Sequence, residues 1–432
     1  GRHPDAVAPN LSRLAARSVV FERAYCQAPI CNPSRASLMS GLRPSTTGVY
    51  HNRNPLRYSP AGRDVVTLPQ HFRAHGYEAT GSGKVYHGKY PDPMSWDSYS
   101  PSPFAQSHPG PAYEGPLHGM EDMGNLEWGG IDVADEEMSD HRSVSDCIEH
   151  LQKPRHRPLF LTCGQTVTHL TWVTPQSTFE RFDPASVQLP EVVDGDLDDV
   201  SPVGRRFANE GLQARMKSEG RWADAVAAYL ACIHFADQQM GRLIEALDSS
   251  DRAQDTYIVF WADHGWHLGE KSHWRKSTLW EEATRVPLMM AGPGIEPGRC
   301  SSPVGLIDIY PTLVELCGLS AAPHLEGQSL VPLLEDPRRD WERPALTTHR
   351  RGDHAVRSQR WRYIRYHDGS EELYDHDADE MEWTNRAHEP ALASVKEDLA
   401  GWLPTMDAPE SEIEDGPGAD RRYRQRIAEL MA

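Results

Sequence analysis

A short run near the start of the chain, CNPSRASLMSG, places the Cys31 thiol directly before Asn-Pro-Ser-Arg. The small residues after the proline favour a helix that begins at this point. A zinc site is a poor explanation for this thiol, because Cys26 lies five residues upstream and no second Cys/His pair with zinc-like spacing follows it. The seven cysteines are scattered and odd in number, which does not fit a disulfide scaffold. The rest of the chain therefore has to explain Cys31.

Two further stretches carry ionisable side chains in patterns that suit chemistry. ATGSGKVYHGKY contains Lys84 and His87, and FWADHGWHLGEKSHWRKS contains Asp263, His264 and Lys276. The second stretch follows the apolar run TYIVFW, which is typical of a buried parallel strand, and α/β enzymes place their chemistry at the carboxyl ends of such strands. Gly265 indicates a turn directly after the adjacent aspartate and histidine.

The elements that must position these residues alternate between helices and strands. Helices are expected at about 10–18, 221–250 and 306–319, and short apolar strands at 158–164 and 256–265. From about Arg343 the pattern changes to short alternating runs, which predict antiparallel strands followed by a charged helix at 391–402. The sequence thus predicts an α/β fold, with a catalytic domain over residues 1–340 and a C-terminal subdomain over residues 341–432.

Composition narrows the class of protein. Of the 432 residues 38% are hydrophobic and 25% are charged, which is ordinary for a globular enzyme. The net charge of −19, with no basic stripe to offset it, argues against a nucleic acid partner. No stretch approaches the roughly 18–20 apolar residues of a membrane span. An anionic substrate would have to be bound by a local cationic pocket, against the field of the whole chain.

Cys-x-Pro-Ser-Arg at the start of a helix resembles the element that marks type I sulfatases, in which the cysteine is oxidised after translation to Cα-formylglycine. The stretches around Lys84 and Asp263 resemble sulfatase segments in the same order, as do GLIDIYPTLVELCGL and EELYDHDADEMEWTN. The whole pattern is similar to the iduronate-2-sulfatase-like branch and covers nearly the entire chain. The resemblance implies an alkaline-phosphatase-like mixed sheet sandwiched by helices, with a smaller C-terminal α+β subdomain.

The resemblance also implies a reaction and a set of residues. The catalytic set is Cys31, Arg35, Lys84, His87, His169 and Lys276, and the Ca²⁺ ligands are Asp263, His264 and residue 31. A hydrated aldehyde at position 31 offers two hydroxyls, one to attack sulfur and one to expel sulfate, and a divalent cation lowers the pKa of one of them. Ca²⁺ suits this site because it accepts carboxylate and hydroxyl oxygens.

Each residue of the catalytic set has an expected role. Arg35 lies one helical turn after residue 31 on the same face, near a helix N-terminus that favours an anion. Lys84 and Lys276 would cover the remaining sulfate oxygens. By resemblance, His87 is the base that releases sulfate, and His169 with Lys276 protonates the leaving oxygen. Outside this set, the residues Arg43, His51, Asp353 and His354 could line the substrate pocket or have structural roles.

The chain departs from the family pattern in two places. Sulfatases begin with a strand that ends in paired, calcium-binding aspartates, and no stretch here matches it, so the N-terminal strand is expected to be missing. In CGQTVTHLTWVTP the family's usual Lys- or Arg-Pro-His is replaced by Val167, Thr168 and His169. Fewer calcium ligands and one cation fewer in the sulfate pocket are therefore expected.

The sequence therefore predicts a formylglycine-dependent sulfatase that acts on a sulfated carbohydrate and is matured by a formylglycine-generating enzyme. A periplasmic or secreted location is favoured. The same scaffold also supports phosphodiester or phosphonate monoester hydrolysis, which is the first alternative. The second alternative is a catalytically silent homologue that binds sulfated glycans. The missing aspartates and Val167 favour it, whereas the intact residues Cys31, Arg35, Lys84 and Asp263 oppose it.

Overall fold

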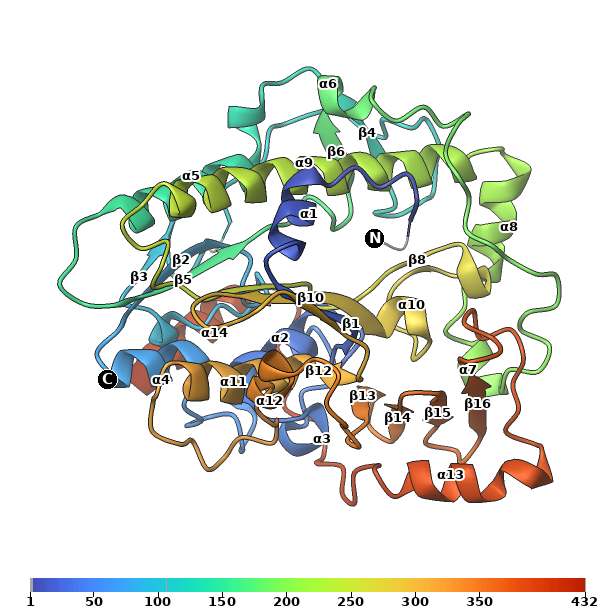
Figure 1. The fold of residues 1–432 in the computed structure, drawn as a ribbon. Helices are drawn as coiled ribbons and strands as arrows, with labels where there is room; N and C mark the ends of the chain where they lie inside the picture. The colour runs from blue at the N-terminus through green and yellow to red at the C-terminus, as the bar shows by residue number, and fades with distance from the viewer. Residues whose placement is uncertain (1–2, 106, 432) are drawn as a thin grey trace. The chain divides into compact units, whose positions relative to one another are not determined.

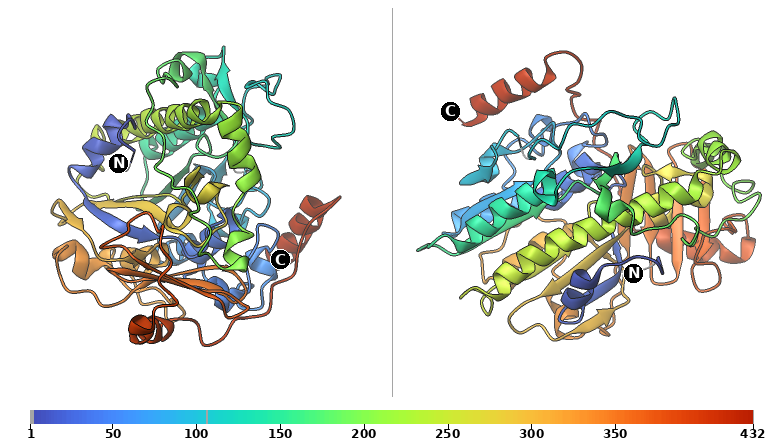
Figure 2. Two further views of the ribbon diagram at one scale, coloured as in Figure 1. Left: turned by 90° about the vertical axis from the view of Figure 1, so that its right-hand side faces the viewer. Right: turned by 90° about the horizontal axis from the view of Figure 1, so that it is seen from above.

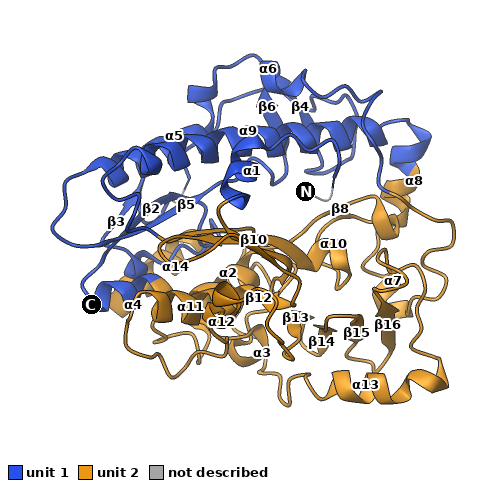
Figure 3. Ribbon diagram, in the orientation of Figure 1, with its two compact units in different colours: residues 1–16, 69–190, 215–256 blue, residues 17–68, 191–214, 257–432 orange. Residues whose placement is uncertain are grey.

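The computed structural model describes residues 3–105 and 107–431. The chain forms two compact units, each assembled from segments that are far apart in the sequence (Figure 3). Unit 1 contains residues 1–16, 69–190 and 215–256, and unit 2 contains residues 17–68, 191–214 and 257–432. The division into domains 1–340 and 341–432 stays a prediction.

Unit 1 is built around parallel strands and two long helices. Its elements are α1 (Pro9–Ala15), β2 (Glu78–Gly83), η2 (Pro93–Ser95), β3 (Ser98–Ser100), β4 (Trp128–Ile131), η3 (Asp135–Glu137), α5 (Ser139–Gln152), β5 (Leu159–Gly164), β6 (Trp172–Pro175), α6 (Gln176–Phe179) and α9 (Trp222–Asp248). Two helices, α4 (Leu68–Ala74) and α8 (Glu210–Ser218), include residues assigned to both units. The long helix predicted at 221–250 is confirmed as α9.

The sheet of unit 1 has the order β3-β2-β5 and is parallel throughout. The register of β2 and β5 runs from Glu78 opposite Leu159 to Gly83 opposite Gly164, so the two strands end together. Helix α5 packs on this sheet, and α5 and α9 run side by side (Figure 2). The strand predicted at 158–164 is thus confirmed as a parallel strand, β5, although it is mostly half-buried where the apolar run predicted a buried strand.

Unit 2 contains a mixed sheet, an antiparallel sheet and the helices around them. Its elements up to residue 305 are β1 (Val19–Tyr25), α2 (Cys31–Ser40), α3 (Pro44–Thr47), η1 (Leu56–Tyr58), α7 (Pro202–Arg205), β7 (Ile258–Trp261), β8 (His267–Leu268), η4 (Glu270–Ser272), β9 (Trp274–Arg275), α10 (Glu281–Thr284), β10 (Arg285–Ala291), β11 (Gly298–Cys300) and β12 (Val304–Gly305). The elements after them are η5 (Leu306–Asp308), α11 (Ile309–Leu316), α12 (Val331–Glu335), β13 (Ala345–Arg350), β14 (Asp353–Arg357), β15 (Trp361–Arg365), β16 (Glu371–Asp375), η6 (Pro390–Leu392), α13 (Ala393–Ala400) and α14 (Ala419–Met431).

The mixed sheet has the order β11-β1-β10-β7, and β12 also pairs with β1. Strands β1 and β11 are parallel, whereas β10 is antiparallel to both β1 and β7. The prediction that the apolar run at 256–265 forms a buried parallel strand is therefore wrong in its direction and burial, because β7 pairs antiparallel with β10 and is half-buried. The reason is topological, since the chain returns through β10 to lie directly beside β7.

The strands β13 to β16 form an antiparallel meander at the lower right of Figure 1, with α13 packed against it. Val356, Tyr363 and Leu373 on its inner face bury their side chains together with Leu399 of α13. This confirms the antiparallel strands and the charged helix predicted after Arg343. The mixed α/β fold class is also confirmed. Among the described residues, no helix combines the length and the apolar character that crossing a membrane requires.

Candidate active site

Cys31 is the first residue of α2, a helix whose ten residues are all buried. Gly41 ends the helix in a left-handed conformation at φ 71°, which favours glycine. At the other end the Asn32 N–H donates to Oδ1 of Asn52 at 2.9 Å. The remaining amide groups of the first turn give residue 31 the positive end of the helix dipole, which stabilises negative charge there.

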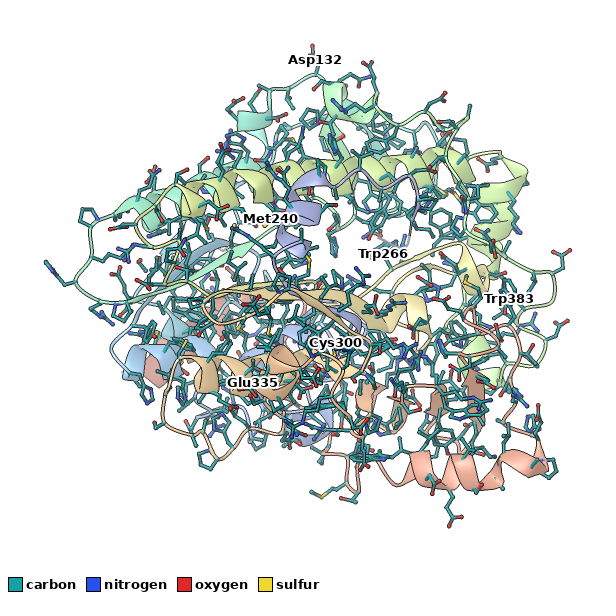
Figure 4. All side chains as sticks on the ribbon, in the orientation of Figure 1. Asp132, Met240, Trp266, Cys300, Glu335 and Trp383 are labelled. Atoms are coloured by element: carbon teal, nitrogen blue, oxygen red, sulfur yellow. The ribbon has the colours of Figure 1, made fainter. Side chains whose placement is uncertain are left out.

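Asp263 and His264 follow β7 and are held in place by a close backbone approach. A Cβ on Gly265 would lie 2.0 Å from the main-chain oxygen of Glu282, so only glycine fits at this position. The Gly265 N–H donates to the oxygen of Ala283 at 2.9 Å. The turn predicted after the two side chains is not found: the chain bends at Asp263 and passes through Gly265 without a turn. The next residue, Trp266, is labelled in Figure 4.

Lys276, His264 and Cys31 converge within unit 2. The Lys276 ammonium lies 2.9 Å from Sγ of Cys31 and 3.2 Å from Nε2 of His264. The same Nε2 lies 3.2 Å from Sγ. The sulfur thus stands at the N-terminus of a helix and in contact with an ammonium group. Both features favour a negative charge at this point.

Arg35 holds the carboxylate of this group. Its Nε donates to Oδ2 of Asp263 at 2.7 Å, and the guanidinium lies 5.6 Å from the ring centre of Trp261. Ser34 Oγ donates to the main-chain oxygen of Asp263. Arg35 is only 7% exposed. The first turn of α2 therefore contacts the segment that follows β7. The Asp263 carboxylate partly neutralises the positive charge of Arg35.

The hydrogen bonds of His264 decide which ring nitrogen can accept. Nδ1 lies 2.9 Å from the main-chain oxygen of Gly265, which can only accept, so Nδ1 carries the proton. Nε2 therefore presents its lone pair toward residue 31, the arrangement that histidine metal ligands have. One ligand atom each from Cys31, Asp263 and His264 lies within 4.8 Å of the others. These three groups fit part of the shell of a divalent cation, while Ca²⁺ takes six to eight ligands.

Unit 1 carries the other three residues of the predicted catalytic set, Lys84, His87 and His169. Lys84 follows β2, and its N–H donates to the main-chain oxygen of Gly164, the last residue of β5, at 3.2 Å. A Cβ on Gly164 would lie 2.3 Å from the carbonyl carbon of Lys84. This close approach of the two strand ends places the segment with Lys84 and His87 beside the start of the loop that leads to His169.

A buried carboxylate on α5, which no pattern in the sequence indicated, shapes that loop. Asp140 accepts hydrogen bonds from the N–H groups of Thr166 and Val167 and from the Thr166 hydroxyl, at 2.7–3.0 Å. Burial raises the pKa of Asp140 above its usual value. Val167 is 8% exposed. Nothing in the spacing along the chain connects Asp140 with this loop, because the two meet only when α5 packs on β5.

Asp353 and His354 have structural partners. Asp353 is fully buried and accepts hydrogen bonds from the N–H and the ring of His367. The ring of His354 lies between the Thr348 hydroxyl at 2.9 Å and the Asp407 carboxylate at 3.1 Å. These contacts favour the structural reading of both residues.

Arg43 and His51 lie in the segment that follows α2. The Arg43 N–H donates to the Glu326 carboxylate. The main-chain oxygen of His51 accepts a hydrogen bond from Nδ2 of Asn32, next to Cys31. Burial lowers the pKa of the half-exposed His51 ring below its usual value.

The chain is similar to known proteins over most of its length. Residues 1–319 match the family model described as Sulfatase, and residues 269–408 match the one described as N-sulphoglucosamine sulphohydrolase, C-terminal. A protein named sulfatase from Formosa agariphila is 37% identical, with 93% of this chain and 82% of that protein covered. A choline-sulfatase from Rhizobium meliloti is 31% identical, with 89% of this chain and 78% of that protein covered. Human iduronate 2-sulfatase is 29% identical, with 73% of this chain and 65% of that protein covered.

Solved structures share the fold. One, described as a complex of its protein with the substrate D-glucosamine-2-N,6-O-disulfate, has a TM-score of 0.73 at 18% identity and covers 92% of each chain. A phosphonate monoester hydrolase from Silicibacter pomeroyi has a TM-score of 0.72 at 22% identity and covers 99% of this chain and 90% of that one. These likenesses confirm the predicted alkaline-phosphatase-like fold.

Proposed function

The chain belongs to the sulfatase family and is a sulfuric ester hydrolase; we propose that it hydrolyses sulfate esters of a carbohydrate, with residue 31 as a formylglycine nucleophile and Ca²⁺ as its metal. The observation that carries the proposal is the meeting of Lys276, His264 and Asp263 around Cys31 at the start of α2. The sulfur occupies the place where the hydroxyls of the modified residue would stand.

The charged and metal-ligating residues of unit 2 have separate roles in the proposed reaction. Formylglycine, when hydrated, supplies two geminal hydroxyls, one to attack sulfur and one to lose its proton as sulfate departs. Asp263 and His264 would hold the divalent cation, which lowers the pKa of the attacking group. The Lys276 ammonium, 2.9 Å from Sγ, neutralises charge that develops on the sulfate and the leaving oxygen. Arg35 keeps the Asp263 carboxylate in place.

The assignments of Lys84, His87 and His169 rest on resemblance and on their place after neighbouring strand ends in unit 1. We propose that His87 takes the proton when sulfate leaves and that His169 protonates the leaving oxygen. Support for a carbohydrate substrate comes from relatives whose names specify one, such as the human iduronate 2-sulfatase.

A comparison of two chromogenic esters tests the reaction. Protein produced together with a formylglycine-generating enzyme should hydrolyse 4-nitrophenyl sulfate faster than a 4-nitrophenyl phosphonate monoester. The reverse preference would identify the chain as a phosphonate hydrolase. Binding of sulfated oligosaccharides without any turnover, despite complete conversion of Cys31, would identify a silent glycan-binding homologue. The rates of sulfate release from sulfated heparan and chondroitin disaccharides then identify the sugar that the enzyme prefers.

A further inference from the structure

Lys276 lies in a segment with an unusual backbone. The non-glycine residues Lys271, Ser272, Arg275 and Ser277 all adopt positive φ, at 53°, 48°, 87° and 76°. L-residues rarely adopt this conformation because of steric conflict with the main chain, and they keep it only where the surroundings enforce it. Two of the four directly flank Lys276. The position of its ammonium therefore depends on whatever holds this segment in place.

The closest support comes from His273. Its Nε2 lies 2.9 Å from the main-chain oxygen of Lys276, so Nε2 carries a proton and donates. Burial lowers the pKa of His273 to about 4, which keeps the ring neutral around pH 7. On the other side of Lys276, the Ser277 N–H donates to the oxygen of Pro29 at 3.0 Å, two residues before Cys31. Hydrogen bonds on both sides of Lys276 thus hold its backbone.

The base of the segment is anchored separately. The buried Lys271 ammonium pairs with Asp196 at 2.5 Å. Trp274 Nε1 donates to Gln213 at 2.5 Å, and the His267 ring bonds to the Thr278 hydroxyl at 2.8 Å. These contacts fix the β8–β9 hairpin, so that loss of the His273 bond would affect the short turn around Lys276 rather than the whole segment.

We propose that His273 is a positioning residue that holds the Lys276 ammonium against residue 31. The inference rests on the role of Lys276 in the proposed function. A lysine side chain has four rotatable bonds and reaches its target only from a defined backbone position. Because the turn around Lys276 is strained, loss of the His273 donor lets the backbone relax and moves the ammonium away from residue 31. A displacement of about 1 Å at such a group costs on the order of 100-fold in rate.

Two substitutions distinguish the hydrogen-bond donor of His273 from the volume of its ring. His273→Leu removes the N–H group, and we expect kcat to fall about 10- to 100-fold with KM changed less than about threefold, since the loss concerns the transition state. His273→Gln keeps an amide N–H close to the Nε2 position and should restore most of kcat. In the double variant His273→Leu/Lys276→Ala, kcat should equal that of Lys276→Ala, because the imidazole acts only through Lys276. Additive losses would overturn the proposal.

A control and a second readout make the test independent of turnover. Val356→Ala, which leaves a small cavity in the buried core of β14, should lower Tm without a change in kcat. In protein made without the maturation enzyme, iodoacetamide alkylation of Cys31 is measured at pH 7 relative to pH 10. The ratio cancels differences in access and should fall equally in His273→Leu and Lys276→Ala, because both remove the ammonium from the sulfur. A normal ratio in His273→Leu with a reduced one in Lys276→Ala would refute the proposal. Reduced ratios in both variants, together with no sulfatase activity in the chain produced with the maturation enzyme, would support the positioning role and contradict the proposed function.

Discussion

Unit 2 contains two groups of possible metal-ligand side chains that look alike in geometry and differ in the cations around them. Cys31, Asp263 and His264 form the first, and Glu281, His376 and Glu382 form the second; in each, the possible ligand atoms lie within 4.8 Å of one another. Both are largely buried. Distance alone would nominate both groups as metal sites.

The partners of the carboxylates distinguish the two groups. In the second group, Arg362 bonds to both Glu281 and Glu382, and the Arg357 Nε lies 3.5 Å from Glu281. Both carboxylates of this group are paired with a guanidinium. A metal ion there would be repelled by the arginines and would have to compete with them for the carboxylate oxygens. In the first group Arg35 pairs with the Asp263 carboxylate, whereas the Lys276 ammonium lies against the Cys31 sulfur, so the two cations exceed the one carboxylate of the group. A cluster with balanced charges thus stabilises the fold, whereas one with excess positive charge can bind an anion.

The largest effect is expected at Cys31. Cys31→Ala should remove turnover by a factor on the order of 10³ or more, because no nucleophile remains at the start of α2. Steady-state kinetics on 4-nitrophenyl sulfate measures the loss. The matched control is Cys26→Ala, a buried thiol of the same unit that should lower Tm and keep kcat. Full activity of Cys31→Ala would show that this cluster is not the reaction centre.

Lys276 is the next most sensitive position. Lys276→Ala should lower kcat by about 10²- to 10³-fold with a smaller change in KM, because the ammonium acts where charge develops. Lys396→Ala, which removes an ion pair with Glu371 in the C-terminal region, serves as the control and should leave kcat unchanged. A loss confined to KM would mean that Lys276 binds the ground state only.

The second group should respond in stability instead. Arg362→Met leaves Glu281 and Glu382 buried without their shared partner, which typically costs about 3–5 kcal/mol. Thermal unfolding should show a large drop in Tm, whereas kcat per folded molecule should be retained at temperatures where the variant is folded. A selective loss of kcat with normal Tm would contradict the structural role of this cluster.

The same cluster predicts a specific pH dependence. Burial raises the pKa of Glu281, but Arg362 and Arg357 outweigh it and hold that pKa well below its usual range. Such a group stabilises the fold fully above its unfolded pKa of about 4.3 and loses this contribution as the pH falls toward the lower folded value. The Tm difference between the unmodified chain and Arg362→Met should therefore shrink below about pH 4. A difference that grows in acid would contradict the sign.

The smallest effect concerns metal. Because the described residues supply three His, Cys, Asp or Glu side chains at the first cluster and Ca²⁺ takes six to eight ligands, Ca²⁺ should raise Tm by only about 1–3 °C at millimolar concentration. Asp263→Asn should abolish the shift and Glu382→Gln should keep it, if the ion binds at the first cluster alone. A shift that disappears only in Glu382→Gln would assign the ion to the second cluster.

The sequence by itself predicted candidate site residues through local patterns. Cys31 and Arg35 are close together in a helical motif, and Asp263 and His264 precede a glycine that the close main chain of Glu282 requires. The strand β5 was also predicted from its apolar run and the helix α9 from its helical periodicity, because composition and spacing are local properties of the chain.

Only the tertiary structure decided which distant residues meet. The direction of β7 depends on its neighbour β10, and a single strand's composition does not specify that pairing. The bonds from Asp140 to the loop at Val167 and from His273 to Lys276 depend on backbone positions that periodicity does not encode. The balance of Glu281 by arginines likewise comes from side chains about 80 residues away, because charge neutralisation depends on distance in space rather than along the chain.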